Sequence, residues 1–71
     1  MIKRPKSKYQ YVFDVYRDTV GEWRWRLWAK NGKVVADSGE GYKRKAGAVR
    51  ACEKLQDFSG STIFVDGVEL E

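Results

Sequence analysis

Hydrophobic and polar side chains alternate along the first part of the chain, which is the pattern of half-buried β-strands. Between Tyr9 and Tyr16 every second residue is aromatic or aliphatic, and the residues between them are more mixed. The run from Trp23 to Lys30 alternates more strictly, with mainly basic residues between the apolar ones. We therefore expect two strands, each with one face toward a core. The expected core residues are Tyr11, Phe13, Val15, Trp23, Trp25 and Leu27.

Turn signals join these strands and add a third. Residues 17–22 connect the first two strands as a hairpin, since they include Asp, Thr and Gly. Asn31-Gly32 is the preferred dipeptide of a two-residue type I′ turn, in which both residues have a positive φ. The run from Lys33 to Ser38 should therefore return antiparallel to the second strand.

The hydrophobic period then changes from that of a strand to that of a helix. Gly39-Glu40-Gly41 ends the third strand. From about Tyr42 to Asp57 the apolar residues recur at the i, i+3, i+4, i+7 spacing of an amphipathic helix. Gly60 suits the left-handed residue after the end of a helix. The expected apolar stripe consists of Ala48, Val49, Ala51, Cys52 and Leu55, with Leu55 assigned to the core.

One further strand closes the chain. Thr62 to Val65 is rich in β-prone residues, Asp66-Gly67 is a second turn signal, and Val68 to Leu70 is a short continuation that would complete a small hairpin. The element order is βββαβ. It predicts an α+β fold in two layers, with an antiparallel sheet and one helix, formed by residues 9–71.

The central segment resembles a known family. The run from Gly21 to Leu27 (GEWRWRL), the Asn31-Gly32 turn and the loop from Ser38 to Tyr42 (SGEGY), in that order and spacing, are similar to the YegP-like family of small proteins of unknown function. The resemblance covers roughly residues 11–55. It implies two βββαβ units, as tandem repeats or as a homodimer, that share one antiparallel sheet and exchange their C-terminal strands. Because this chain has one unit, the resemblance implies the homodimer.

Three features depart from the family pattern. They are the basic extension before Tyr9, the side chain of Trp28, and the C-terminal segment 63–68. A specific role would be added at these places, since the family itself transfers no activity.

The size of the chain also favours self-association. A chain of 71 residues buries only about 60 % of its unfolded surface, and small domains recover stability through disulfides, metals or oligomers. A single cysteine forms no internal disulfide, and a chain with one cysteine and no histidine is not expected to hold zinc. We expect a homodimer without metal or cofactor.

The basic charge is concentrated at the N-terminus. Lys and Arg outnumber Asp and Glu by 14 to 10, and residues 1–8 hold four basic residues and no acid. We interpret residues 1–8 as a flexible basic tail, which could also steer the protein to a polyanion. No apolar run is long enough to span a membrane or to form a signal peptide, which predicts the cytoplasm of a bacterium, an archaeon or a virus-infected host.

A catalytic role is not expected. General acid–base and nucleophilic catalysis usually draw on His, or on Ser or Cys beside a base. The chain has no His, and Cys52 lies on the apolar stripe of the helix, where a small core residue is expected. No carboxylate pair or phosphate-binding glycine motif is evident.

The outer face of the second strand is the expected contact surface. Arg24, Arg26 and Trp28 share this face, and Trp with Arg is the composition enriched at protein-binding hot spots. A protein partner, bound by an adaptor or an inhibitor, is the preferred hypothesis. The alternative is DNA or RNA, since arginines beside an aromatic ring also bind nucleic acids. A third interpretation is that Trp28 covers the helix of the second subunit.

Basic residues also precede the helix. Lys43 and Arg44 stand where the helix dipole favours anions, so these side chains and the free N–H groups would suit a phosphate or a carboxylate. We expect Lys43 and Arg44 to add to the contact surface if the partner is anionic. The alternative is that they extend into solvent or pair with Glu40.

Overall fold

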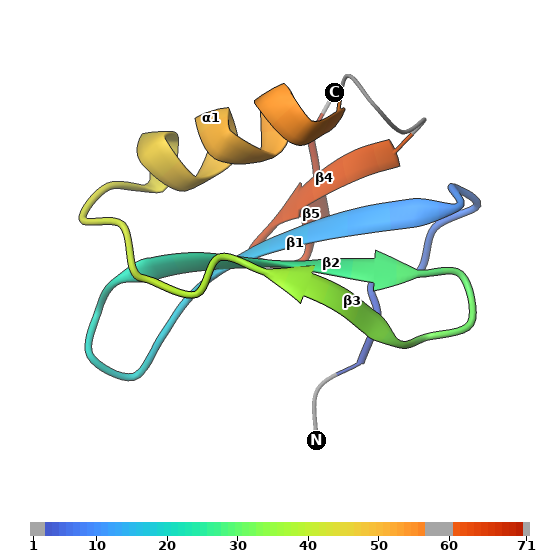
Figure 1. Cartoon of the computed structure of the whole chain (residues 1–71), viewed down its shortest axis with the longest axis horizontal. Helices are drawn as coiled ribbons and strands as arrows, with labels where there is room; N and C mark the ends of the chain where they lie inside the picture. Colours follow the sequence, from blue (N-terminus) through green and yellow to red (C-terminus); the bar gives the residue numbers. More distant parts are fainter. Residues whose placement is uncertain (1–2, 57–60, 71) are drawn as a thin grey trace.

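A five-stranded sheet carries one helix on one of its faces (Figure 1). The computed structural model describes residues 3–56 and 61–70. The predicted α+β class with a single helix is confirmed within these residues. The elements in chain order are β1 (Tyr11–Arg17), β2 (Trp23–Ala29), β3 (Val34–Asp37), α1 (Lys45–Gln56), β4 (Ser61–Val65) and β5 (Val68–Glu69).

The sheet is mixed, with the strand order β3-β2-β1-β4-β5. The pairs β1–β2, β2–β3 and β4–β5 are antiparallel, but β4 runs parallel to β1 of the same chain. The prediction of an antiparallel sheet is therefore wrong for this pair. The cause is the connection: β3 runs in the direction of β1, α1 carries the chain back across the sheet, and β4 starts again in the direction of β1.

The helix begins later than predicted. It begins at Lys45 and is described to Gln56. The predicted end at Asp57 and the cap at Gly60 lie outside the described residues. At the other end of the chain, residues 3–10 form neither helix nor strand.

Two turns that contain glycine differ in geometry. In the Asn31-Gly32 pair only Gly32 has a positive φ, 86°, so the predicted two-residue type I′ turn does not form. The N–H of Gly32 instead donates to the carbonyl of Ala29 (3.0 Å), and Gly32 supplies the left-handed residue of a three-residue connection. Between β4 and β5 both Asp66 (51°) and Gly67 (83°) have the positive φ of a type I′ turn. The predicted C-terminal hairpin is confirmed.

The edge strand β3 is short and irregular. All four of its residues are exposed. Its register against β2 shifts between Leu27, which lies opposite Ala36, and Trp28, which lies opposite Val34. Val35 is thus the extra residue of a β-bulge.

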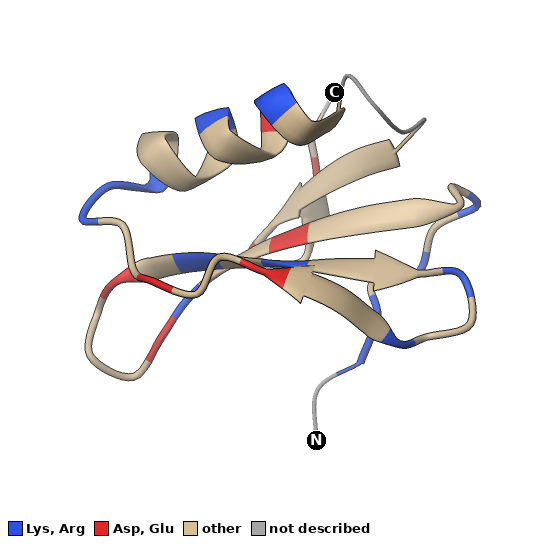
Figure 2. Cartoon of the chain, in the orientation of Figure 1, with Lys and Arg blue, Asp and Glu red and all other residues tan. Residues whose placement is uncertain are grey.

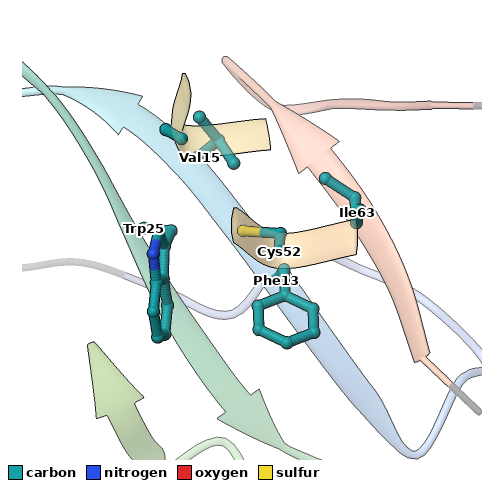
Figure 3. Close-up of a cluster of buried hydrophobic side chains, with 6 residues drawn as sticks. Phe13, Val15, Trp25, Cys52 and Ile63 are labelled. Carbon is teal, nitrogen blue, oxygen red and sulfur yellow. The ribbon is translucent and has the colours of Figure 1, made fainter. Parts of the chain in front are cut away.

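The main core lies between α1 and the sheet (Figure 3). Phe13, Val15 and Trp25 are buried there, as predicted. The ring of Trp25 packs edge-on against Phe13, with 5.7 Å between the ring centroids. Ala48 and Cys52 of the helix are fully buried, and such small side chains let a helix approach a sheet closely. The predicted strand register is therefore confirmed.

Three of the other predicted core residues are only partly buried. Trp23 and Leu27 pack against the core from its margin, and Tyr11 is half-buried. The prediction for Leu55 is wrong, because its side chain is 42 % exposed. Leu55 stands in the last turn of α1, beyond the contact that the small residues make with the sheet.

The opposite face of the sheet holds a second apolar cluster, formed by Val12, Trp28 and Phe64. Trp28 was expected to be exposed on this face, but it is only 3 % exposed. The reason is the pairing of the strands: Val12 lies directly opposite Trp28, and the parallel strand β4 brings Phe64 onto the same face. The first described residues of the chain also lie on this side of the sheet (Figure 1).

Candidate functional site

Arg24 and Arg26 lie on the face of the sheet that α1 does not cover. Side chains alternate between the faces of a strand, and Trp25 between them points into the core under the helix. Across the hairpin, Tyr16 stands opposite Arg24 and Asp14 stands opposite Arg26. The two arginine side chains remain 32 % and 22 % exposed. The structure thus confirms their predicted orientation.

Asp18 fixes Arg24 to the turn between β1 and β2. Its Oδ2 accepts a hydrogen bond from Nε of Arg24 (2.7 Å), and its Oδ1 accepts from the N–H groups of Val20 (3.0 Å) and Glu22 (2.9 Å). The bond from Arg24, followed by that from Glu22, lowers the pKa of the Asp18 carboxyl, and the same carboxylate raises the pKa of Arg24. One side chain therefore closes the turn and orients the guanidinium.

Arg26 is held by an aromatic ring and a carboxylate. Its Cζ lies 3.9 Å from the centroid of the Tyr16 ring, within the range of a cation–π interaction. Its Nη1 lies 4.0 Å from Oδ2 of Asp14. Two side chains on β1 therefore restrict the guanidinium on β2.

Asp14 is a half-buried carboxylate in this cluster. Burial raises its pKa; a polar contact with Trp28 and the charge of Arg26 oppose that rise, whereas the Asp66 carboxylate adds to it. The buried indole N–H of Trp28 has no hydrogen-bond partner of good geometry among the described residues. It is nevertheless close enough to Asp14 to favour the charged form of that carboxyl. Trp28 and, to a smaller extent, Arg26 therefore stabilise the charged form of Asp14.

A shallow hollow of about 660 Å³ opens beside these groups. It is lined by the β1–β2 turn together with Tyr16, Arg24 and Arg26. The arrangement offers two oriented guanidinium groups and an aromatic ring around an open depression. Such groups can bind a planar polar or aromatic surface of a partner.

The other predicted contact residues lie elsewhere. Lys43 and Arg44 are exposed on the loop between Tyr42, which bridges to Trp23, and the start of α1. Within the described residues neither forms a salt bridge with Glu40. The structure therefore separates these two from Arg24 and Arg26, which lie on the other face, and it buries Trp28.

One basic residue from α1 and one from β1 lie beside Trp23. Nζ of Lys45 lies 5.9 Å from the centroid of a Trp23 ring, and Cζ of Arg17 lies 5.8 Å from it. Both distances are at the outer limit of cation–π interactions. These contacts hold Lys45 against the sheet.

The thiol of Cys52 does not offer a nucleophile. Burial, with a smaller effect of the Glu53 carboxylate, raises its pKa to about 12. At neutral pH it is therefore protonated and inaccessible. Among residues 3–56 and 61–70, no three His, Cys, Asp or Glu side chains are grouped to hold a metal ion. No helix in this part of the chain is long and apolar enough to cross a membrane.

Comparison with known proteins places the chain in a family. Residues 18–62 match the family described as "Domain of unknown function (DUF1508)". The chain belongs to this family. The match agrees with the resemblance to YegP-like proteins of unknown function.

Relatives occur in bacteria and archaea. The UPF0339 protein Atu0232 of Agrobacterium fabrum is 43 % identical over 56 residues, which cover 79 % of this chain and 89 % of that protein. The UPF0339 protein in the ptx operon 5′ region of Stutzerimonas stutzeri is 43 % identical over 45 residues, which cover 63 % of this chain and 40 % of that protein. The solution structure of a protein from Haloferax volcanii is similar to this chain, with a TM-score of 0.61 and 39 % sequence identity. The match covers 69 % of this chain and 82 % of the Haloferax chain.

The sequence analysis missed the three residues that orient the arginines, which are Asp14, Tyr16 and Asp18. The register of the hairpin could have revealed them. Once residue 17 pairs with residue 23, all other pairs between β1 and β2 are fixed. Tyr16 and Asp14 then fall opposite Arg24 and Arg26. Of the three, only Asp18 lies within the segment that matches the family.

Proposed function

We propose that this protein is a non-catalytic homodimeric binding module, an adaptor or an inhibitor, whose partner is another protein. The contact surface is the helix-free face around Arg24 and Arg26. The observation that carries the proposal is the fixed orientation of these arginines beside an open hollow, through Asp18 for Arg24 and through Tyr16 and Asp14 for Arg26. A side chain that is already ordered loses less entropy when a partner binds.

The charges on this face favour a protein over a nucleic acid. Each arginine faces a carboxylate of its own chain, so the face offers little net positive charge to a polyanion. Arginine and tyrosine next to a depression are instead typical of protein-binding hot spots.

Replacing both arginines by lysine tests the surface. The variant Arg24→Lys/Arg26→Lys keeps the charges but loses the planar guanidinium groups. We expect at least a tenfold loss of partner capture from a lysate of the native host, a loss of about 1.4 kcal/mol or more, with little change in melting temperature. The matched control is Arg50→Lys on the exposed side of α1. An identical set of captured proteins for wild type and the double variant would contradict the proposal.

The homodimer is supported by an apolar groove between α1 and the β4–β5 hairpin. The groove has a volume of about 460 Å³ and is lined mainly by apolar side chains, among them Val49 and Val65. At its rim Val68 is 68 % exposed and Leu70 is 42 % exposed. β5 is also a free edge of the sheet. A second copy would cover both the groove and the edge. The relative from Stutzerimonas stutzeri is long enough to hold a second unit in one chain.

Sedimentation equilibrium tests the dimer. We expect twice the chain mass of 8.2 kDa at tens of micromolar, and a shift to the single chain in Val68→Asp. Val20→Asp is the matched control, because Val20 is 76 % exposed in the β1–β2 turn, away from the groove. A wild-type protein that sediments only as the single chain would overturn the dimer.

We further propose that the two chains of the dimer exchange their C-terminal strands. In a swapped dimer the β1–β4 pairing would form between two chains, so subunits could separate only by unfolding. Mixing dimers that carry two different dyes should then give energy transfer only on the timescale of unfolding. Exchange within seconds would reject the swap and retain the dimer.

A further inference from the structure

The basic residues of the N-terminal segment and those of the β2–β3 turn lie at the same end of the sheet. β1 begins at Tyr11, which pairs with Ala29, the last residue of β2. The residues before Tyr11 and those after Ala29 therefore leave the sheet together. Figure 2 shows Lys and Arg gathered at this end, with no Asp or Glu of the described residues beside them in that view.

Arg4 gives the N-terminal segment a defined shape. Its Nη1 donates to the carbonyls of Pro5 and Ser7 (both 3.2 Å), and its Nη2 donates to the carbonyl of Tyr9 (2.5 Å). The N–H of Tyr9 donates in turn to Oγ of Ser7 (3.1 Å). The segment is thus folded around one guanidinium.

The lysines of this segment are exposed to solvent. Lys3, Lys6 and Lys8 are exposed, whereas Arg4 is half-buried. Tyr9, next to Lys8, presents an aromatic ring that is 39 % exposed. The segment therefore displays ammonium groups and an aromatic ring from a backbone to which Arg4 is hydrogen-bonded.

The β2–β3 turn adds two more lysines. Lys30 and Lys33 are exposed, and the backbone hydrogen bond from Ala29 to Lys33 (2.8 Å) holds the turn in place. We call Lys3, Lys6, Lys8, Lys30 and Lys33 the basic end. Within the described residues none of these five takes part in a salt bridge.

We propose that the basic end binds single-stranded nucleic acid, with the phosphates on the lysines and a base stacked on Tyr9. Lysines without acidic partners repel one another, and a polyanion removes that repulsion. An exposed aromatic ring among cations is the combination that single-strand binders use. An anionic membrane or an acidic peptide would use the lysines but would leave the ring without a base to stack on. This site is independent of the proposed function, because it lies at the opposite end of the β1–β2 hairpin from the hollow beside Arg24 and Arg26.

Fluorescence anisotropy with a labelled oligothymidylate of about 12 nucleotides tests the proposal on the full-length protein. For single strands, each phosphate contact adds about −0.7 to the slope of log affinity against log salt concentration, so five lysines predict a slope of about −3.5. Affinity should then fall by roughly 130-fold between about 50 and 200 mM salt. Lys30→Gln/Lys33→Gln should flatten the slope by about 1.4.

Two controls make the test specific. Lys43→Gln/Arg44→Gln removes the same charge at the other end of the sheet and should leave the slope unchanged. Tyr9→Ala should weaken binding by about tenfold, whereas Tyr9→Phe should retain it.

Three results would overturn the proposal. One is equal weakening by the two charge-removing pairs, which would indicate a non-specific effect of net charge. Another is equal binding by Tyr9→Ala and wild type. The last is binding to vesicles that contain phosphatidylserine without binding to the oligonucleotide. The variant Arg24→Lys/Arg26→Lys should bind the oligonucleotide normally, so failure here and failure of the proposed protein-binding surface are distinguishable.

Discussion

Replacing Phe13 with alanine is expected to destabilise the protein by about 4 kcal/mol. Phe13 is fully buried, and it packs edge-on against Trp25 at the centre of the core under α1. Because small domains have total stabilities of only about 5 to 15 kcal/mol, a loss of this size would remove a large part of the total stability. Urea unfolding followed by tryptophan fluorescence measures the change.

Leu55→Ala is the matched control for this prediction. Its side chain is 42 % exposed, so its truncation should cost less than about 1 kcal/mol. If Leu55→Ala destabilised the protein as strongly as Phe13→Ala, the helix would present a different face to the sheet from the one described.

Replacing Trp28 with alanine is expected to cost about 3 kcal/mol and to lower the melting temperature by about 15 °C. Trp28 is only 3 % exposed and packs with Val12 and Phe64 on the helix-free face. The truncation would leave a cavity there and would remove the polar contact with Asp14. Differential scanning calorimetry provides the measurement.

Trp28→Phe and Val20→Ala bracket this result. The phenylalanine variant keeps most of the apolar volume and should lose less than half as much stability. Val20 is 76 % exposed, and its truncation should be nearly neutral. A change below about 0.5 kcal/mol for Trp28→Ala would mean that the ring is exposed, as the sequence alone suggested.

The strand alternation predicted the main core because its signal is local. Phe13, Val15 and Trp25 point inward by the period of two, and the structure keeps that register. The second cluster was missed because its cause is distant in the sequence. Phe64 reaches the helix-free face only through the parallel pairing of β4 with β1, and that pairing depends on where α1 returns the chain.

The same contrast between local and long-range signals explains which parts of the candidate site could be predicted. Alternation was sufficient to place Arg24 and Arg26 on one face, since Trp25 lies between them. The alternation did not show that Asp18 and Asp14 compensate the charges of the two arginines, because those contacts depend on the register of the hairpin. Only part of the basic end was evident in the sequence, namely the charge of the N-terminal segment. That Lys30 and Lys33 lie at the same end of the sheet follows from the pairing of Tyr11 with Ala29.

The irregular edge of β3 has a consequence for how copies of this chain associate. A sheet with two regular borders could add molecule after molecule and grow into a fibre. The displaced residue Val35 interrupts the repeat of backbone donors and acceptors along one border. Growth is thereby blocked on that side, so the dimer contact that we propose at the C-terminal border would end at a pair of chains.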